Sequence, residues 1–304
     1  MNIFTATLAY NIVVTDIAHA IIIEPGFPTD CGVPAVHQVH NSAASQIKVT
    51  ASPYVWPWNV GLWSETVGSY PYCGGALISY SLILTTAHCI KIHYGCTQFP
   101  LGTEFELMGE TFNSLNVLIG AHDFTRNDGY EQLYTVQSAI VHPDFNFDKS
   151  VRGYDIAVLK LLSPITPSPA VRPICFPSSQ TNLPRGYPCF FAGWGKMYTV
   201  WSLNMLVLPK LLQEGQVEMD LDAYCEVFDA DYTSVRHSCI KSRYTNPCFG
   251  DSGGGIFCPS ENNKWFWYGA ICGGTFDCLG GWTVVNNFSS VHSWIRDSVL
   301  SLGL

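Results

Sequence analysis

The sequence contains few charged residues. Only 13% of its 304 residues are Asp, Glu, Lys or Arg, and the formal net charge is -9. The 15 Lys and Arg residues form no dense run, so the sequence does not support binding to nucleic acid or to an anionic membrane. Hydrophobic residues make up 47% of the chain, enough to bury a sizeable core, which excludes an intrinsically disordered protein.

The sequence also lacks the closely spaced cysteine pairs that are typical of zinc sites. None of its 12 cysteines belongs to a Cys-x-x-Cys pair. An even number of scattered cysteines favours disulfides formed in an oxidising compartment. We therefore expect a secreted, disulfide-bonded protein rather than a zinc protein.

The amino terminus has no positive charge, because no Lys or Arg precedes Lys48. Residues 1–23 are mostly apolar, and Ala18-His19-Ala20 has the small-x-small form of a signal-peptidase site, which predicts a signal peptide over residues 1–20. The positive region of a signal peptide is missing, and Asp16 interrupts the apolar run. A membrane span needs about 20 apolar residues, and we expect none.

Helical periodicity is scarce before the carboxyl terminus. Gly and Pro recur at short intervals, and the segments between them are short and rich in Val, Ile, Leu and Tyr. This pattern predicts an all-β barrel or sandwich. The expected strands include Ala76–Ser79, Leu82–Thr85, Val117–Ile119, Ile156–Leu159 and Trp265–Tyr268.

Two other segments differ from this pattern. Near the end of the chain, helical spacing relates Val291, Trp294, Ile295 and Val299. This spacing predicts a terminal amphipathic helix with Ser289 or Ser290 as its N-cap. The stretch from Lys91 to Asn113 has weak periodicity and is expected to be a long surface loop.

Three segments offer the parts of a serine acyl-transfer site, which needs a base, a carboxylate that orients it, and donors for the oxyanion. His88 follows an apolar strand, although a single His is more often structural. Asp155 opens an apolar run and must be paired or hydrogen-bonded if buried, although this segment alone favours a strand-capping Asp. Ser252 is flanked by glycines that let backbone N–H groups point at the same spot as its Oγ.

The order His, Asp, Ser in these motifs resembles the chymotrypsin/trypsin family. The resemblance extends from about Cys31 to the carboxyl terminus. It is carried by nine ordered motifs, namely Thr86-Ala-His-Cys89, Asp155-Ile-Ala-Val-Leu-Lys-Leu161, Gly250-Asp-Ser-Gly-Gly254, Trp56-Pro-Trp58, Cys73-Gly-Gly-Ala-Leu-Ile78, Val141-His-Pro143, Arg172-Pro-Ile-Cys175, Ala192-Gly-Trp-Gly195 and Trp294-Ile295. It implies an all-β fold of two six-stranded antiparallel β-barrels with a C-terminal helix and a cleft between the barrels.

The resemblance also implies the roles of the site residues. Ser252 would be the nucleophile, His88 the general base and then acid, and Asp155 the orienting carboxylate. The backbone N–H groups of Gly250 and Ser252 would form the oxyanion hole. The implied enzyme is a monomeric serine endopeptidase that acts on proteins or peptides, binds protein inhibitors, and needs no metal or other cofactor.

The implied domain organisation follows the motifs. The predicted ranges are a propeptide or tethered light segment over 21–46, a peptidase domain over 47–304, a first barrel over about 47–165, a second barrel over about 176–287 and a helix over about 289–300. Five disulfides are implied by resemblance, each stabilising by about 2–4 kcal/mol. They are Cys31–Cys175, Cys73–Cys89, Cys189–Cys258, Cys225–Cys239 and Cys248–Cys278.

Two cysteines remain after these pairings. A sixth bond between Cys96 and Cys272 would clamp a loop over the cleft. Alternatively, Cys272 is free and offers Asp155 a weak S–H donor where the family usually has a Ser.

The expected specificity residues depart from the trypsin pattern. Asn246 stands at the implied floor of the primary pocket, where trypsin-like enzymes have Asp, so a preference for Arg or Lys is not supported. Cys272-Gly273-Gly274 replaces the family's Ser-Trp-Gly wall, and the missing Trp should open the cleft.

The activation segment departs further. The family is cut to free an Ile-Val-Gly-Gly terminus, whose amino group pairs with the residue that is Asp251 here. Ser45-Gln46-Ile47-Lys48 stands in that place. A cut after Gln46 or after Lys48 would leave the new terminus about 7 or 13 Å short, respectively. A third alternative is that the usual activation does not occur.

Three functional hypotheses follow. An active endopeptidase is favoured because all the catalytic parts are present, whereas a secreted, inactive homologue that binds partners is favoured by the altered activation segment, Cys272 and Gly273. A serine esterase on an α/β sheet would need the reverse order of catalytic residues and more helix.

Asn287-Phe-Ser289 is the one glycosylation sequon, and its use is left open.

Overall fold

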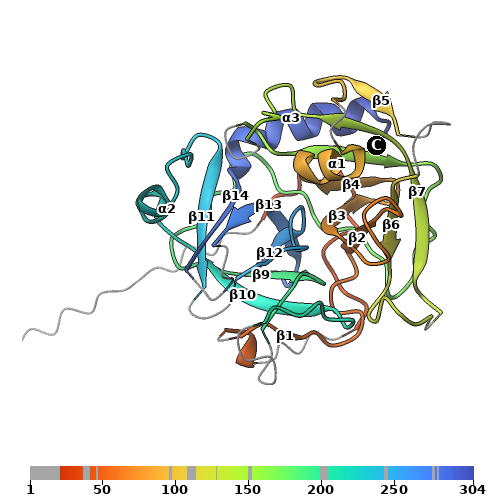
Figure 1. Ribbon diagram of the computed structural model, residues 1–304, viewed down its shortest axis with the longest axis horizontal. Coiled ribbons are helices and arrows are strands. Elements are labelled where there is room, and N and C mark those ends of the chain that lie inside the picture. Colours follow the sequence, from red (N-terminus) through yellow and green to blue (C-terminus); the bar gives the residue numbers. More distant parts are fainter. Residues whose placement is uncertain are drawn as a thin grey trace, which may run out of the picture.

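The computed structural model describes most of the chain as two antiparallel sheets and three α-helices (Figure 1). The described residues are 21–36, 42–45, 47–95, 98–107, 114–127, 129–149, 153–198, 205–242, 246–275, 278 and 281–304. The predicted signal peptide, Gln46 and Cys96 lie outside them.

The first sheet closes into a barrel. Its strands are β2 (Asn59–Trp63), β3 (Cys73–Ser79), β4 (Leu82–Thr85), β6 (Asn116–Ile119), β7 (Gln132–Val141) and β8 (Ala157–Leu161). They follow the order β7-β6-β2-β3-β4-β8, and β7 pairs again with β8, which closes six strands into a ring. A short seventh strand, β5 (Glu104–Glu106), pairs with β7 beside this ring.

The second sheet closes in the same way. Its strands are β9 (Pro188–Gly193), β10 (Gln213–Met219), β11 (His237–Ser242), β12 (Gly255–Pro259), β13 (Trp265–Gly274) and β14 (Gly281–Asn286). They follow the order β10-β11-β14-β13-β12-β9, and β9 pairs again with β10. The expectation of two six-stranded antiparallel barrels is confirmed. The two-residue strand β1 (Val49–Thr50) falls in the range predicted for the first barrel but pairs with β10 of the second.

The carboxyl-terminal helix is α3 (Phe288–Ser301), as predicted. Its N-cap is Asn287 rather than Ser289 or Ser290, because the Asn287 side chain accepts a hydrogen bond from the backbone N–H of Ser290. The Nδ2 atom of Asn287, which a glycan would occupy, donates to the carbonyl of Ser234 at 2.6 Å. None of the helices in the described part of the chain is long and apolar enough to cross a membrane.

The expectation of a loop from Lys91 to Asn113 is wrong in part. Helix α1 (Ala87–Tyr94) runs into this stretch, and β5 lies within it. The side chain of Phe99 is buried and stacks on Phe105, with ring centroids 5.5 Å apart. Aromatic packing therefore holds part of this segment against the first barrel, which weak periodicity could not reveal.

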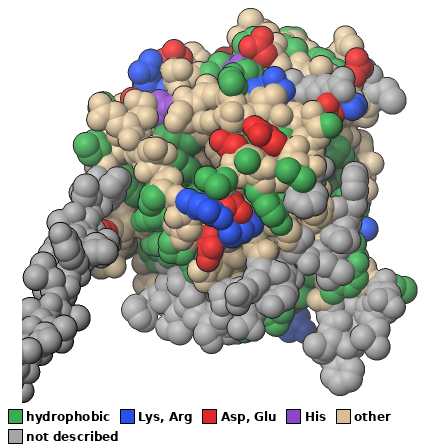
Figure 2. Space-filling model, turned by 90° about the vertical axis from the view of Figure 1, so that its left-hand side faces the viewer, with side chains coloured by type: hydrophobic (Ala, Val, Ile, Leu, Met, Phe, Trp, Pro, Cys, Tyr) green, Lys and Arg blue, Asp and Glu red, His purple; other side chains and the backbone are tan. Residues whose placement is uncertain are grey.

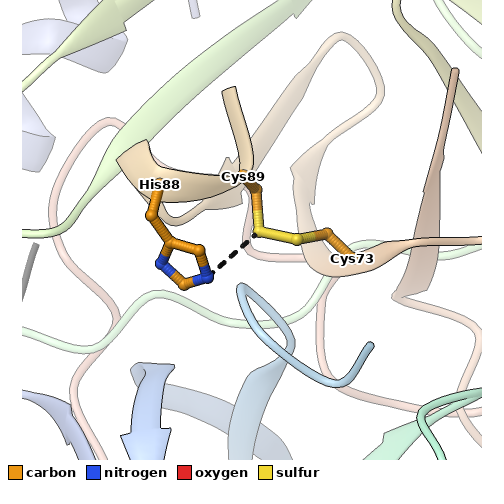
Figure 3. Close-up of side chains that lie close together, drawn as sticks. All are labelled: Cys73, His88 and Cys89. Atoms are coloured by element: carbon orange, nitrogen blue, oxygen red, sulfur yellow. Dashed lines mark hydrogen bonds between the residues drawn. A yellow bond between two sulfur atoms is a disulfide. The ribbon is translucent and has the colours of Figure 1, made fainter. Parts of the chain in front are cut away.

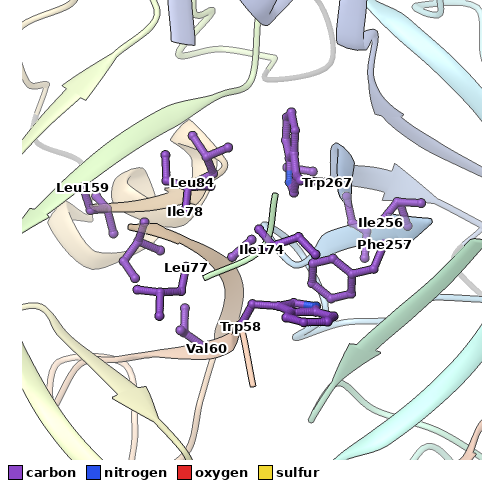
Figure 4. Close-up of a cluster of buried hydrophobic side chains, with 14 of the residues drawn as sticks. Trp58, Val60, Leu77, Ile78, Leu84, Leu159, Ile174, Ile256, Phe257 and Trp267 are labelled. Atoms are coloured by element: carbon purple, nitrogen blue, oxygen red, sulfur yellow. The ribbon is translucent and has the colours of Figure 1, made fainter. Parts of the chain in front are cut away.

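The barrels meet in a shared core of large hydrophobic side chains. Figure 4 shows Leu77 of β3 on one side, Phe257 of β12 and Trp267 of β13 on the other, and Ile174 between them, with the ring of Trp58 extending toward Phe257. The rings of Trp58 and Phe257 lie 6.0 Å apart in an edge-to-face arrangement, which adds to the stabilisation from burial. This contact fixes the two barrels relative to one another.

Five disulfides reinforce the fold. They join the same cysteines as the pairings given above, namely Cys31–Cys175, Cys73–Cys89, Cys189–Cys258, Cys225–Cys239 and Cys248–Cys278. The first bond attaches the amino-terminal segment to the connection between the barrels. Such a set is typical of proteins that mature in an oxidising compartment.

Charges of both signs share the face of the molecule that carries α2 (Asp222–Phe228), where Figure 2 shows Lys and Arg side chains beside Asp and Glu side chains. Among the ion pairs of the described residues, Asp220 pairs with Arg185 at 2.9 Å and with Lys241 at 3.3 Å. This face therefore presents a mixed field rather than a basic patch.

We predict that Trp58→Ala lowers the free energy of unfolding by about 3–5 kcal/mol, because the side chain is fully buried between the barrels and its removal leaves a cavity. Trp58→Phe should cost much less. Denaturant unfolding of both variants measures the difference. Equal stability of Trp58→Ala and the parent would contradict the assigned packing.

Candidate active site

His88 is the second residue of α1, directly after β4. Its ring Nδ1 lies 2.6 Å from Oδ2 of Asp155, and its backbone N–H donates to Oδ1 of the same carboxylate at 2.8 Å. When Nδ1 carries the proton and donates this hydrogen bond, Nε2 of the neutral ring is left as a hydrogen-bond acceptor. The two bonds fix both the backbone and the ring of His88 relative to Asp155.

The environment of His88 raises its pKa above the ordinary value. Burial alone would lower this pKa, and the charge of Lys91 also lowers it. The charge of Asp155 and the hydrogen bond to it act in the opposite direction and prevail. The imidazole therefore accepts a proton more readily than a free histidine does.

Asp155 lies just before β8 and is only 1% exposed. Its carboxylate is satisfied by His88, as a buried carboxylate must be. Its backbone carbonyl accepts a hydrogen bond from Nδ2 of Asn286, in β14 of the second barrel, at 3.2 Å. Both barrels therefore hold this residue in place.

Ser252 lies in the turn before β12, where two glycines adopt positive φ angles, +102° at Gly250 and +80° at Gly253. A Cβ atom on Gly253 would lie 2.3 Å from Oγ1 of Thr85, so only glycine fits there. The backbone N–H of Gly74 in β3 donates to the carbonyl of Ser252 at 2.7 Å. The turn of the second barrel is thus docked directly on the first barrel.

The turn leaves backbone donors available. Within the described chain, the N–H groups of Gly250 and Ser252 have no hydrogen-bond acceptor. Backbone N–H groups without another acceptor are the kind of donor that can stabilise a negatively charged oxygen in acyl transfer.

One cavity of about 920 Å³ joins these residues. Its lining includes the predicted site residues His88, Gly250, Ser252, Cys272, Gly273 and Gly274. In the described part of the chain, no hydrogen bond joins Nε2 of His88 to Oγ of Ser252. Such bonds are often long without substrate and tighten when it binds.

The imidazole of His88 also faces a disulfide. Nε2 lies 3.8 Å from Sγ of Cys89, as the dashed line in Figure 3 shows. His88, Cys89 and Cys73 have metal-ligand atom types within 4.8 Å of one another, but the two sulfur atoms are bonded to each other. Because metal binding requires thiolates, this group is not a thiolate metal site.

Asn246 lies behind the cavity wall instead of forming its open floor. It is 2% exposed, and its side-chain Nδ2 donates to Oγ1 of Thr275 at 3.1 Å and to the carbonyl of Trp282 at 3.4 Å. Thr275 and Trp282 themselves line the cavity. The sequence analysis missed both residues, because no motif marks them.

Asp251 has a partner that the sequence analysis also missed. Oδ2 of Asp251 lies 2.6 Å from Nζ of Lys48, and both side chains are buried. One sequence signal could have drawn attention to this lysine, since it is the only Lys or Arg in the first 90 residues.

Cys272 is a free, buried thiol, so the sixth disulfide to Cys96 is not formed. Its nearest carbonyl acceptor is that of Ala270 at 3.4 Å, and the carbonyl of Asp155 lies at 3.9 Å. The thiol therefore faces the backbone of Asp155 rather than its carboxylate. Burial, with a smaller effect from the charge of Asp155, raises the pKa of Cys272 well above the ordinary value.

We predict that iodoacetamide at pH 8 leaves Cys272 unmodified in the native protein, because the thiol is buried and its raised pKa keeps it protonated. Mass spectrometry of the peptide that contains Cys272 measures the modification. Unfolding in guanidinium without a reductant should expose the thiol and serves as the control. Rapid alkylation in the native state would contradict the burial.

The sequence matches the family model described as Trypsin over residues 48–295. Human chymotrypsin-like elastase family member 3A is 29% identical over 270 residues, which cover 86% of this chain and 91% of that protein. Member 3B is 30% identical over 259 residues, which cover 83% and 87%. Mouse atrial natriuretic peptide-converting enzyme is 29% identical over 255 residues, which cover 82% of this chain but 20% of the enzyme.

A solved structure, that of GrC, shares the fold with a TM-score of 0.66 and 27% identity, covering 83% of this chain and 99% of that one. The sequence and structure matches thus span most of the chain and agree with its two closed barrels. The chain belongs to the chymotrypsin/trypsin-like family of serine proteases.

Proposed function

We propose that the protein is a secreted serine endopeptidase in which Ser252, His88 and Asp155 carry the chemistry. The observation that supports this most directly is the 2.6 Å contact between Nδ1 of His88 and Asp155, in a cavity that Ser252 also lines. The free N–H groups of Gly250 and Ser252 supply the oxyanion donors. The family and the five disulfides support the reaction class and the secreted location.

The reaction proceeds in two steps. Oγ of Ser252 attacks the carbonyl carbon of the scissile bond, and its proton passes to Nε2 of His88. The C–N bond then breaks, and the imidazolium gives the proton to the departing amine. In the second step, water attacks the acyl carbon and gives a proton to His88. The bond between the acyl carbon and Oγ then breaks, and the imidazolium returns the proton to Oγ of Ser252 as the new acid product leaves. The N–H groups of Gly250 and Ser252 stabilise the oxyanion in both steps.

The substrate side chain is proposed to be uncharged or polar. The buried Asn246 amide is neutral and holds Thr275 and Trp282 at the cavity wall. This part of the cavity wall therefore offers no ion pair to Arg or Lys. Gly273 and Gly274 carry no side chain to narrow the cavity, which suits a bulky segment of the substrate.

The second candidate function is that of a secreted, inactive homologue that binds partners. The observation that favours it is the Lys48–Asp251 pair, because an internal lysine occupies the place where the family uses a freed amino terminus. The two candidates differ in whether Ser252 reacts as a nucleophile.

We predict that a serine-reactive phosphonate labels the protein covalently at Ser252. Labelling should disappear in Ser252→Ala, and mass spectrometry of the labelled peptide identifies the site. Ser260→Ala, on a hydroxyl at the end of the second barrel's β12, serves as a control that keeps its labelling. Absence of labelling in the folded wild-type protein would favour the binding protein instead.

A second prediction concerns pH. Catalysis needs neutral His88, and its raised pKa places the acid limb of kcat/KM above the ordinary histidine value of about 6.5. Activity should therefore rise with pH through that limb. Asp155→Asn removes the charge that raises the pKa, so the limb should move to lower pH while kcat/KM falls on the order of 10⁴-fold.

The second-order rate constant of phosphonate labelling at Ser252, measured as a function of pH, reports both the position of the acid limb and the loss of reactivity. Asp297→Asn, on the exposed face of α3, provides a matched control with unchanged rates. An acid limb that stays in place in Asp155→Asn would argue against the assigned role of this carboxylate.

A further inference from the structure

Asp251 stands in sequence between the two residues that supply the oxyanion donors, and its carboxylate is fully buried. Oδ1 accepts a hydrogen bond from the backbone N–H of Gly195 at 2.9 Å. Oδ2 accepts one from the N–H of Cys248 at 2.8 Å and one from Nζ of Lys48 at 2.6 Å. A buried carboxylate is costly unless it is both hydrogen-bonded and paired with a positive charge. In this structure Lys48 provides that charge.

Lys48 is itself buried and makes its contacts in the same pocket. Lys48 is 6% exposed. Its Nζ also donates a hydrogen bond to the carbonyl of Gly195 at 2.8 Å and lies 5.7 Å from the ring centre of Phe191. Burial lowers the pKa of Lys48 below its ordinary value, and the charge of Asp251 and the hydrogen bond to it offset part of this effect. The 2.6 Å separation of Nζ and Oδ2 of Asp251 is typical of a charge-assisted hydrogen bond between an ammonium and a carboxylate.

The pocket is closely fitted around this ion pair. A Cβ atom on Gly195 would lie 2.4 Å from Cγ of Asp251, so the carboxylate packs directly on the backbone. The backbone of Lys48 is held by the strand that follows it, since Val49 of β1 is paired with Glu214 of β10. The ammonium therefore reaches Asp251 from a fixed point.

The intact chain runs past the pocket without inserting a terminus. Ile47 is 53% exposed, and its N–H donates to the carbonyl of Ala43, in the 3-10 helix η1 (Ser42–Ser45), at 2.8 Å. The Lys48 side chain already occupies the position next to Asp251. The backbone nitrogens of Ile47 and Val49 are therefore not the groups that pair with Asp251.

We propose that the side-chain ammonium of Lys48 takes the structural role of a freed amino terminus, so that the uncut chain is already catalytically competent. Lys48 acts as a positioning residue. It neutralises Asp251, and Asp251 fixes the turn that aims the N–H groups of Gly250 and Ser252. This inference rests on the proposed peptidase function. It also implies that a cut after Lys48 lowers activity, because the cut frees the segment that delivers the ammonium.

The first test uses the wild-type protein. The secreted chain is reacted with the phosphonate, and the labelled molecules are analysed by reduced intact mass and by sequencing across residues 42–50. Labelling of molecules whose 46–47 and 48–49 peptide bonds are intact supports the proposal. Labelling that occurs only in molecules cut at one of these bonds overturns it while leaving the peptidase function standing. No labelling in any form overturns the proposed function and this inference together.

The second test changes the lysine. Lys48→Met keeps the length and apolar stem of the side chain but removes the charge, and it should slow labelling of the uncut chain about 100-fold or more, the effect of a lost oxyanion donor. Lys210→Met removes an exposed positive charge and serves as the matched control, with wild-type rates expected. Unchanged labelling of uncut Lys48→Met would overturn the proposal.

Chemical rescue separates a positioning role from a purely structural one. Lys48→Ala leaves room for a small cation beside Asp251, so methylammonium or ethylammonium should restore labelling in a saturable manner. The uncharged alcohols of equal size should not. Equal rescue by the alcohols and the ammonium compounds would overturn the assignment of charge as the cause. So would the absence of any rescue in a Lys48→Ala protein that thermal unfolding shows to be folded.

Discussion

The buried carboxylate of Asp251 links parts of the molecule that are far apart in the sequence. Its hydrogen bonds come from its own turn, from Gly195 after β9, and from Lys48 before β1. Removing one partner from a buried ion pair is strongly destabilising, because the remaining charge keeps its desolvation cost. The amino-terminal segment and the turn that carries Ser252 therefore form one cooperative unit.

A second buried carboxylate couples the two barrels. Asp155 belongs to the first barrel by position, receives its imidazole partner from α1, and is held by Asn286 of the second barrel. The backbone bond from Gly74 to Ser252 crosses between the barrels in the opposite direction. The geometry of the cavity is thus a property of inter-barrel packing, to which the Trp58–Phe257 contact contributes.

The sequence was sufficient for features that depend on local residues. The short apolar segments between Gly and Pro predicted an all-β fold, and the hydrophobic spacing near the carboxyl terminus predicted α3. The ordered motifs, through their resemblance to a known family, implied the two barrels and several residues of the cavity, among them His88 and Ser252. It was insufficient for features set by long-range contacts. The residues of the Lys48–Asp251 pair are 203 positions apart in the sequence. The placement of Asn246 behind the cavity wall depends on its hydrogen bonds to Thr275, after β13, and to Trp282 of β14. The strand β5 was missed because its stability comes from pairing with β7.

The bond between Cys31 and Cys175 has a consequence for competition at the pocket. It anchors the amino-terminal segment, and the bond from Gly32 to the carbonyl of Pro173, at 2.9 Å, reinforces the attachment. With β1 paired on the other side, Lys48 is tethered at both ends and behaves as an intramolecular ligand of Asp251. Its effective concentration does not fall on dilution, so any soluble amine must outcompete it by mass action.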